Sequence, residues 1–174
     1  SNLTVNNKVV SNLMIDGGFD NSDISYIYND DNYSWENGTL KVTVNTTQKF
    51  LRKNLSQVSG LTNHILYARV ATKKTNASLE PGLYVITASE FGYWHDNEGT
   101  CVDFDNSDTV NTWKNVSCLV TSKYDKLTNV MVAQANNKAS GIIYFDNFLI
   151  LDLTEIFGSG NEPTQEWCDK NIVF

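Results

Sequence analysis

The chain has 174 residues, 41% of them hydrophobic and 11% aromatic, so it is long enough to bury a hydrophobic core in one domain of ordinary size. Its formal net charge of −7 argues against nucleic acid as a partner, because phosphate-rich ligands require clustered Lys and Arg. No stretch approaches the ~20 apolar residues of a membrane-spanning helix, so we expect no membrane insertion.

Along most of the chain the hydrophobic period is two rather than 3.6. Residues 39–45 and 64–72 alternate in side-chain character, and further β-branched or aromatic runs cover residues 82–91, 113–121, 128–135 and 141–150. Turn-forming residues separate these runs, and no amphipathic helix is expected between them. The pattern predicts an all-β fold, an antiparallel jelly-roll β-sandwich rather than a parallel α/β sheet.

The last segment has a different pattern. Asp152 and Glu155 form a capping-box pattern, a loop with two glycines follows, and Thr164 is placed to cap a second short helix. We therefore expect residues 1–151 to form the sandwich and residues 152–174 to form a short helical C-terminal appendage packed on it. Its expected apolar anchors are Ile156, Phe157 and Trp167.

The three cysteines do not have the spacing of a metal site. Cys101 and Cys118 each lie in a strand-like run, and we interpret both as small buried hydrophobic residues. A disulfide is not expected, because a domain of this size needs no covalent cross-link. These features favour assembly in a reducing compartment.

Several motifs resemble those of jelly-roll carbohydrate-binding modules found beside xylanases and related glycosidases. "NLMIDGGFDN" (12–21) is similar to the opening motif of that family, and "GIIYFDNFLILD" (141–152) is similar to its closing strand. The runs "HILYARVATKK" and "NTWKNVSCLVT" are similar to its central strands. The resemblance covers roughly residues 12–151 and implies a non-catalytic carbohydrate-binding module.

The segment "DLTEIFGSGNEPTQEW" (152–167) resembles the one that follows such a sandwich in tail and other virion proteins of bacteriophages and prophages. This resemblance implies recognition of host cell-surface polysaccharide and contacts with other virion or tail subunits. It also implies location in a virion assembled in the bacterial cytoplasm, with an extracellular or bacterial cell-surface location as the alternative. Two other functions stay open: a structural tail or capsid-decoration module without a glycan ligand, and a targeting module of a bacterial glycoside hydrolase.

The resemblance to carbohydrate-binding modules also implies a structural calcium ion, Ca²⁺. In that family the ion is held by the carboxylate just after the opening Phe and by the Asp of the closing strand, which correspond here to Asp20 and Asp146. Asp20 replaces a longer Glu, and the alternative is two ordinary aspartates at strand ends. The run "DFDNSD" (103–108) lacks the Gly and Glu of an EF-hand loop, so we interpret it as a solvated turn.

A saccharide site requires flat aromatic faces and a few planar polar groups. Tyr93 and Trp94 follow a strand among turn-forming residues, three tyrosines occur in a polar loop, and Tyr67 and Arg69 share a face that is expected to line a concave sheet. The ligand-binding candidates are therefore Trp94, Tyr93, Tyr26, Tyr28, Tyr33, Tyr67 and Arg69. For Trp94, the leading candidate, the alternative is a lid packed over one end of the sandwich. Trp35 and Trp113 are expected in the core.

Nothing in the sequence supports catalysis. His64 and His95 lie in different turns, and neither has a serine or cysteine motif beside it. Asp30 and Asp31 are adjacent, so their carboxylates point apart and do not flank one glycosidic bond. We therefore predict that the protein is not an enzyme.

Overall fold

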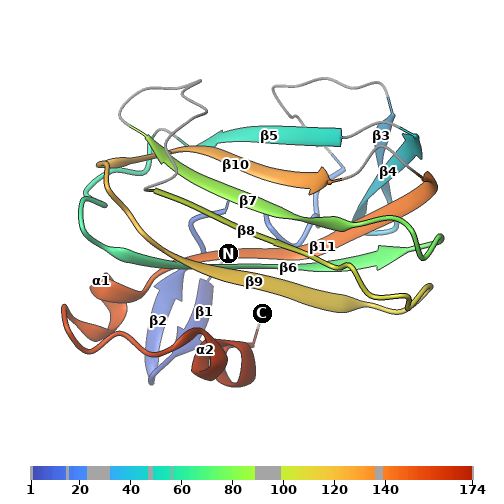
Figure 1. The fold of residues 1–174 in the computed structure, drawn as a ribbon. Helices are drawn as coiled ribbons and strands as arrows, with labels where there is room; N and C mark the ends of the chain where they lie inside the picture. The colour runs from blue at the N-terminus through green and yellow to red at the C-terminus, as the bar shows by residue number, and fades with distance from the viewer. Residues whose placement is uncertain are drawn as a thin grey trace.

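The computed structural model describes residues 2–14, 16–22, 32–46, 49–55, 57–88, 99–135 and 139–173. Apart from a two-stranded hairpin, its strands form two sheets stacked face to face (Figure 1). Every strand pairing within these residues is antiparallel, and the helices of the described part follow the last strand. The predicted antiparallel β-sandwich with a short helical ending is therefore confirmed.

The four-stranded sheet has the order β5-β10-β7-β8 and consists of β5 (Lys49–Leu55), β10 (Lys126–Gln134), β7 (Pro81–Ala88) and β8 (Thr100–Phe104). The five-stranded sheet has the order β3-β4-β11-β6-β9 and consists of β3 (Tyr33–Glu36), β4 (Thr39–Asn45), β11 (Ser140–Asp152), β6 (Ile65–Lys74) and β9 (Lys114–Thr121). A separate hairpin is formed by β1 (Asn2–Val5) and β2 (Lys8–Ser11). The helices are α1 (Leu153–Phe157) and α2 (Gln165–Asn171).

The main core lies between the two sheets and follows from side-chain alternation. In β4, Leu40, Val42 and Val44 are buried while the residues between them are partly exposed. Successive side chains of a strand point to opposite faces, so one face of β4 enters the core and the other turns outward. The opposing sheet contributes residues such as Leu83 and Val132 to the same core.

Strand β6 departs from this alternation because both of its faces are buried from Leu66 to Thr72. Its inner face joins the main core, whereas Tyr67 on its outer face belongs to a second hydrophobic cluster. That cluster is completed by the neighbouring strand β11, the hairpin and the C-terminal segment, through Leu3, Val5, Leu149, Leu151, Leu153, Ile156, Cys168 and Ile172. Figure 1 shows the hairpin, α1 and α2 on the outer side of the five-stranded sheet.

The prediction that Cys101 and Cys118 do not pair is wrong. Both are buried as expected, but they form a disulfide with their Cα atoms 5.9 Å apart. β8 and β9 belong to different sheets and contact each other at one edge of the sandwich, which brings the two cysteines together. The bond therefore cross-links the two sheets, and Cys168 is a free, buried thiol.

The prediction that Trp35 and Trp113 pack in the core is also wrong, because 38% of Trp35 and 40% of Trp113 is exposed. Trp35 lies on the edge strand β3, which has a neighbour on one side only, and its Nε1 donates a hydrogen bond to the Phe19 carbonyl at 2.8 Å. Trp113 immediately precedes the edge strand β9. Edge positions leave both rings partly open to solvent.

Lys74 is a buried cation at the end of β6, with 1% of its side chain exposed. Its Nζ donates to backbone carbonyls of two separate segments, at 2.8 Å to Leu79, 3.1 Å to Asp105 and 2.6 Å to Ser107. The Asp105 carboxylate lies 3.8 Å from the same nitrogen and accepts from Ser107. Asp105 is thus buried rather than part of a solvated turn, because its carboxylate helps to neutralise Lys74.

Replacing Lys74 with Met should destabilise the protein strongly, because the carbonyls and the Asp105 carboxylate would lose their buried donor. We expect a loss of about 3–5 kcal/mol in the free energy of unfolding, measured by urea denaturation. Lys170→Met is the matched control, since Lys170 is exposed on α2 and should change stability by no more than ~0.5 kcal/mol. Equal effects of the two substitutions would contradict a structural role for the buried ammonium.

Candidate functional site

Four of the ligand-binding candidates, Tyr26, Tyr28, Tyr93 and Trp94, lie outside the described residues. The chain places Tyr93 and Trp94 in the connection between β7 and β8, and the other two tyrosines in the connection that precedes β3. Their roles stay predictions. Tyr33, on β3, is partly buried and packs against the main core.

Tyr67 and Arg69 do not line an open concave sheet, so this part of the prediction is wrong. They share the outer face of β6 as expected, but only 0% and 6% of them is exposed. The reason is that α2 and the residue after it bind to this face. Arg69 Nη2 donates to the Ile172 carbonyl at 2.8 Å, and Tyr67 donates from its hydroxyl to Asp169 Oδ1 at 2.6 Å.

The same carboxylate on α2 receives a second hydrogen bond from the sheet. Ser117 Oγ on β9 donates to Asp169 Oδ1 at 2.6 Å, and Gln165 Nε2 donates to the Ser117 carbonyl at 2.8 Å. Burial and the hydrogen bond to Asp169 raise the pKa of Tyr67, so its hydroxyl keeps the proton that it donates. Burial also raises the pKa of the Cys168 thiol to about 11, which leaves it protonated and poorly reactive at neutral pH.

The unusual ending "DLTEIFGSGNEPTQEW" therefore has a structural explanation. The Asp152 carboxylate accepts from Glu155 N as the N-cap of α1, and Thr164 Oγ1 accepts from Trp167 N as the N-cap of α2, both as predicted. Glu162 bridges the loop between the helices by accepting from Thr154 Oγ1 at 2.7 Å and from Gly160 N at 2.8 Å. Hydrogen bonds within the segment fix its two helices and their loop, and hydrogen bonds from α2 attach it to β6 and β9.

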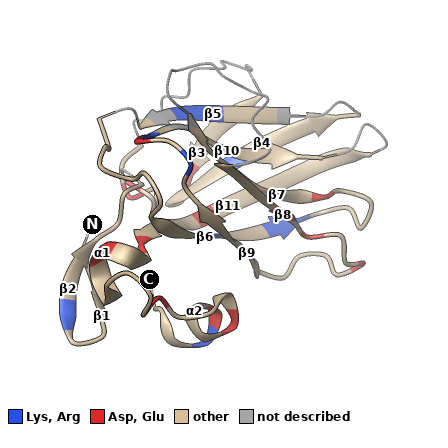
Figure 2. Cartoon of the chain, turned by 60° about the vertical axis from the view of Figure 1, so that its left-hand side comes forward, with Lys and Arg blue, Asp and Glu red and all other residues tan. Residues whose placement is uncertain are grey.

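Of its three expected anchors, only Ile156 is fully buried. Trp167 is 38% exposed and packs edge-to-face on Phe157, with the ring centroids 5.7 Å apart. Figure 2 shows charged positions of both signs on α2.

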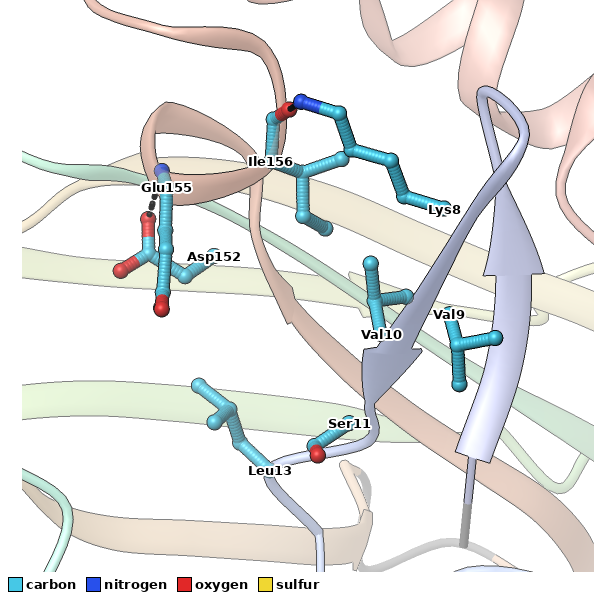
Figure 3. Close-up of a pocket in the computed structure, with 8 residues that line it drawn as sticks. All are labelled: Lys8, Val9, Val10, Ser11, Leu13, Asp152, Glu155 and Ile156. Carbon is cyan, nitrogen blue, oxygen red and sulfur yellow. Dashed lines mark hydrogen bonds between the residues drawn. The ribbon is translucent and has the colours of Figure 1, made fainter.

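A pocket of about 290 Å³ lies between the hairpin and α1 (Figure 3). It is lined by Lys8, Val9, Val10, Ser11, Leu13, Asp152, Glu155 and Ile156. Its most buried polar group, the Asp152 carboxylate, is engaged with Glu155 N and lies 2.6 Å from His64 Nδ1, and Lys8 Nζ donates to the Ile156 carbonyl. These polar groups hold α1 in place. Because they already have partners within the protein, we do not assign the pocket as the ligand site.

The outer face of the four-stranded sheet carries a row of three aromatic rings from three strands. Phe50 on β5, Tyr84 on β7 and Phe104 on β8 are all partly exposed. The centroid distances are 5.8 Å from Phe50 to Tyr84 and 5.4 Å from Tyr84 to Phe104, and both contacts are edge-to-face. Tyr84 alternates with Leu83 and Val85, which belong to the core, so the row faces away from the core.

The strand register explains how these rings meet. Phe50 pairs with Ala133, Ala133 with Gly82, and Gly82 with Phe104, so two small residues separate the outer rings. A Cβ at Gly82 would lie 2.0 Å from the Asp103 carbonyl and 2.5 Å from the Phe104 ring, so the row requires glycine there. Because Ala133 and Gly82 have small or no side chains, the Tyr84 ring can lie between the rings of Phe50 and Phe104.

One charged side chain, that of Arg52, lies beside this row. Arg52, Met131, Tyr84 and Val102 are neighbours in the next row of the register, and Arg52 is 6% exposed. At this exposure the Arg52 guanidinium lies beneath the rings rather than at the surface, so the partly exposed rings are the groups of this face that a saccharide can reach. Sequence analysis missed Phe50, Arg52, Tyr84 and Phe104. Assigning both faces of "KFLRK", "GLYVI" and "TCVDF" would have shown an aromatic residue on the outer face of each.

The loop after the hairpin brings Asp20 towards Asp146 on β11. Asn12 fixes this loop, because its Oδ1 accepts from Met14 N and Ile150 N and its Nδ2 donates to the Phe148 carbonyl, all within 3.0 Å. Gly17 permits the close approach, since a Cβ there would lie 1.9 Å from that carbonyl. β11 has a register irregularity between Asp146 and Leu149, where the loop joins it.

Asp146 has a raised pKa, mainly because of burial and partly because of the nearby Asp20 charge. Two carboxylates from distant parts of the chain therefore repel each other where the opening loop meets β11. Among the described residues, no three His, Cys, Asp or Glu side chains gather as a metal site. A cation here would need backbone or water oxygens to complete its shell, which is compatible with calcium, since it accepts carbonyl and water ligands.

No protein-family model matches the sequence, and no curated protein is similar to it in sequence. The fold is similar to that of solved carbohydrate-binding modules. A family 16 module aligns with a TM-score of 0.54 and 12% identity, covering 80% of this chain and 99% of its own. A module of family 4 aligns with a TM-score of 0.51 and 12% identity, covering 78% of this chain and 97% of its own.

A putative sugar-binding protein from Bacteroides thetaiotaomicron aligns with a TM-score of 0.51 and 12% identity, covering 82% of this chain and 100% of its own. At this identity the comparison establishes the fold, and the chain has the fold of carbohydrate-binding modules. No helix in the described residues is long and apolar enough to cross a membrane.

Replacing Tyr67 with Phe tests the covered face. The substitution removes the donor to the Asp169 carboxylate and should cost about 1.5–3 kcal/mol in unfolding free energy, with faster hydrogen exchange at the backbone amides of α2. Any saccharide binding should be unchanged, because Tyr67 is fully buried. Loss of binding with unchanged stability in Tyr67→Phe would restore Tyr67 as a ligand residue.

Proposed function

We propose that the protein is a non-catalytic carbohydrate-binding module and that its ligand contacts the outer face of the four-stranded sheet. The observation that carries this proposal is the row of partly exposed rings Phe50–Tyr84–Phe104. Aromatic side chains stack on the apolar face of a sugar ring, and planar polar groups bind its hydroxyls. The fold supports the proposal, because proteins described as carbohydrate-binding modules share it.

Tyr93 and Trp94 are proposed to contribute to the same face. They lie in the connection from β7 to β8, the two strands that carry Tyr84 and Phe104. Tyr26, Tyr28 and Tyr33 are proposed as further contacts on the basis of sequence alone. Arg69 and Tyr67 are left out, because α2 covers them.

A binding role without catalysis is supported by the state of the described titratable groups. His64 lies 2.6 Å from the Asp152 carboxylate, and Asp152 caps α1 at the same time. Both groups therefore have structural partners. The neighbouring carboxylates Asp20 and Asp146 lie where the opening loop meets β11 and not beside the aromatic row.

We propose host cell-surface polysaccharide as the ligand and a phage or prophage tail or other virion protein as the parent chain. Support comes from the sequence resemblance of residues 152–167, in which Asp152, Thr154 and Glu162 have defined structural roles. The Cys101–Cys118 disulfide supports exposure to an oxidising environment, as in an extracellular or cell-surface location. A targeting module of a glycoside hydrolase is the second candidate, and the disulfide suits it equally.

Tyr84→Ala tests the proposed face, because it removes the central ring of the row. Retention by immobilised xylan, β-glucan, mannan and host cell-wall polysaccharide should show one or more ligands for the native protein. Affinity for that ligand should fall at least tenfold in the variant. Trp167→Ala is the matched control, since it removes a partly exposed aromatic ring from the appendage and should leave affinity unchanged.

Two other results have defined meanings. If Trp94→Ala abolishes binding and Tyr84→Ala does not, the site lies in the connection between β7 and β8 and not on the sheet face. If the native protein is retained by no polysaccharide, the structural-module alternative is favoured.

We propose in addition that Asp20 and Asp146 hold a structural calcium ion. Their mutual proximity and the burial of Asp146 support it, because an ion would neutralise two carboxylates that otherwise repel each other. The ion would fix the opening loop to β11, next to the contacts that Asn12 already makes.

Chelation by EDTA should lower the melting temperature of the protein, and added calcium should restore it. Asp146→Asn should abolish this calcium dependence. In EDTA the variant should be no less stable than the native protein, because it removes a partly buried charge that faces Asp20. Asp108→Asn, an exposed change outside the joint, should keep the native response. A melting temperature that is insensitive to EDTA would contradict the site.

A further inference from the structure

One part of the outer face of the five-stranded sheet is covered, and another part is open. The appendage covers Tyr67 and Arg69, whereas Lys73, four residues beyond Arg69 on the same face of β6, is partly exposed. Figure 1 shows the hairpin and both helices beneath one part of this sheet, with no described element beneath the remainder. The open part is therefore available to a ligand from solvent.

A continuous row of side chains crosses this open part. Tyr144 on the central strand β11 pairs with Lys41 on β4 and with Lys73 on β6, and Trp113 lies beyond Lys73 at the start of β9. Lys73 Nζ lies 4.8 Å from the centroid of the Tyr144 ring and 5.0 Å from that of the Trp113 ring. The lysine thus interacts with both rings and holds them on either side of its ammonium group.

The described side chains of this row include two lysines and one carboxylate. Glu36 Oε1 lies 3.0 Å from Lys41 Nζ, and hydrogen bonds from Lys41 and then Tyr144 lower the pKa of Glu36. Glu36 is therefore ionised and shared between these two groups. Among the described carboxylates, none forms an ion pair with Lys73. The charge of Lys73 also lowers the pKa of Glu36, so among the described residues of this row two lysines share one carboxylate. The row therefore presents a net positive charge beside two aromatic rings, in a protein whose net charge is −7.

We infer that this row is a second saccharide-binding face and that it takes an anionic sugar, with the sugar ring against Trp113 and the acidic group at Lys73. Trp113 is 40% exposed and supplies an aromatic surface, and the exposed Asn115 supplies an amide on the neighbouring outward position of β9. A purely apolar partner would have to desolvate Lys73 without a counter-charge, which is costly. An acidic sugar supplies that counter-charge.

This face is independent of the proposed ligand face. The two lie on opposite sheets of the sandwich, so both can be occupied at once. A polysaccharide with acidic and neutral stretches, or two separate strands, would then be held by one domain with increased avidity.

Polygalacturonate and its fully methyl-esterified form are suitable probes, because they differ in charge but not in the sugar backbone. The native protein should bind the acid form in affinity electrophoresis, and more weakly as salt increases. Trp113→Ala should weaken binding at least tenfold. Lys73→Gln should weaken binding of the acid form and reduce its salt dependence, while leaving any binding of the ester unchanged.

Three controls make the test decisive. Lys170→Gln removes an exposed lysine from the appendage and should bind like the native protein. Trp113→Phe keeps an aromatic ring and should retain most of the affinity, which separates loss of the ring from loss of folding. Tyr84→Ala should leave polygalacturonate binding intact even if it abolishes binding elsewhere, so failure of the first face is distinguishable. Absence of polygalacturonate binding by the native protein, or unchanged binding by both Trp113→Ala and Lys73→Gln, would overturn the inference.

Discussion

The burial of Arg69 and Tyr67 on the outer face of β6 is the constraint on which the functional surfaces of this protein depend. A guanidinium and a phenol that lose contact with water require hydrogen-bond partners, and α2 with its following residue provides them through Asp169 and the Ile172 carbonyl. The appendage is therefore fixed to one sheet and to one end of it. Its position decides which faces of the sandwich remain open to ligands.

Once that end of the five-stranded sheet is covered, the two remaining faces carry aromatic rings. One is the face of the four-stranded sheet with Phe50, Tyr84 and Phe104, and the other is the open part of the five-stranded sheet with Tyr144 and Trp113. They differ in their polar groups. Arg52 on the first is almost fully buried beside the rings, whereas Lys73 on the second is partly exposed between them. The second face therefore presents a positive charge to a ligand, whereas the first presents mainly aromatic rings.

A disulfide and several buried hydrogen bonds fix the strands and turns near both faces. The Cys101–Cys118 disulfide joins the sheets at the edge formed by β8 and β9, and Asn12 joins the opening loop to β11. Lys74 connects two turns at another point through their backbone carbonyls. Because these contacts join the strands to each other and to the neighbouring turns, aromatic rings on the strands are held in place before a ligand binds, which reduces the entropy lost on binding.

The sequence by itself determined the period-two strands, which face of β4 and of β6 enters the core, and the caps of the closing helices at Asp152 and Thr164. These features depend on neighbours within a few residues, so local pattern is sufficient to predict them. Only the tertiary structure decided that Tyr67 and Arg69 are covered, that Cys101 meets Cys118, that Trp113 is exposed, and that Phe50, Tyr84 and Phe104 form one row. Alternation assigns a side chain to one of two faces, but whether that face is covered, and which strands are its neighbours, depends on contacts between segments far apart in the chain.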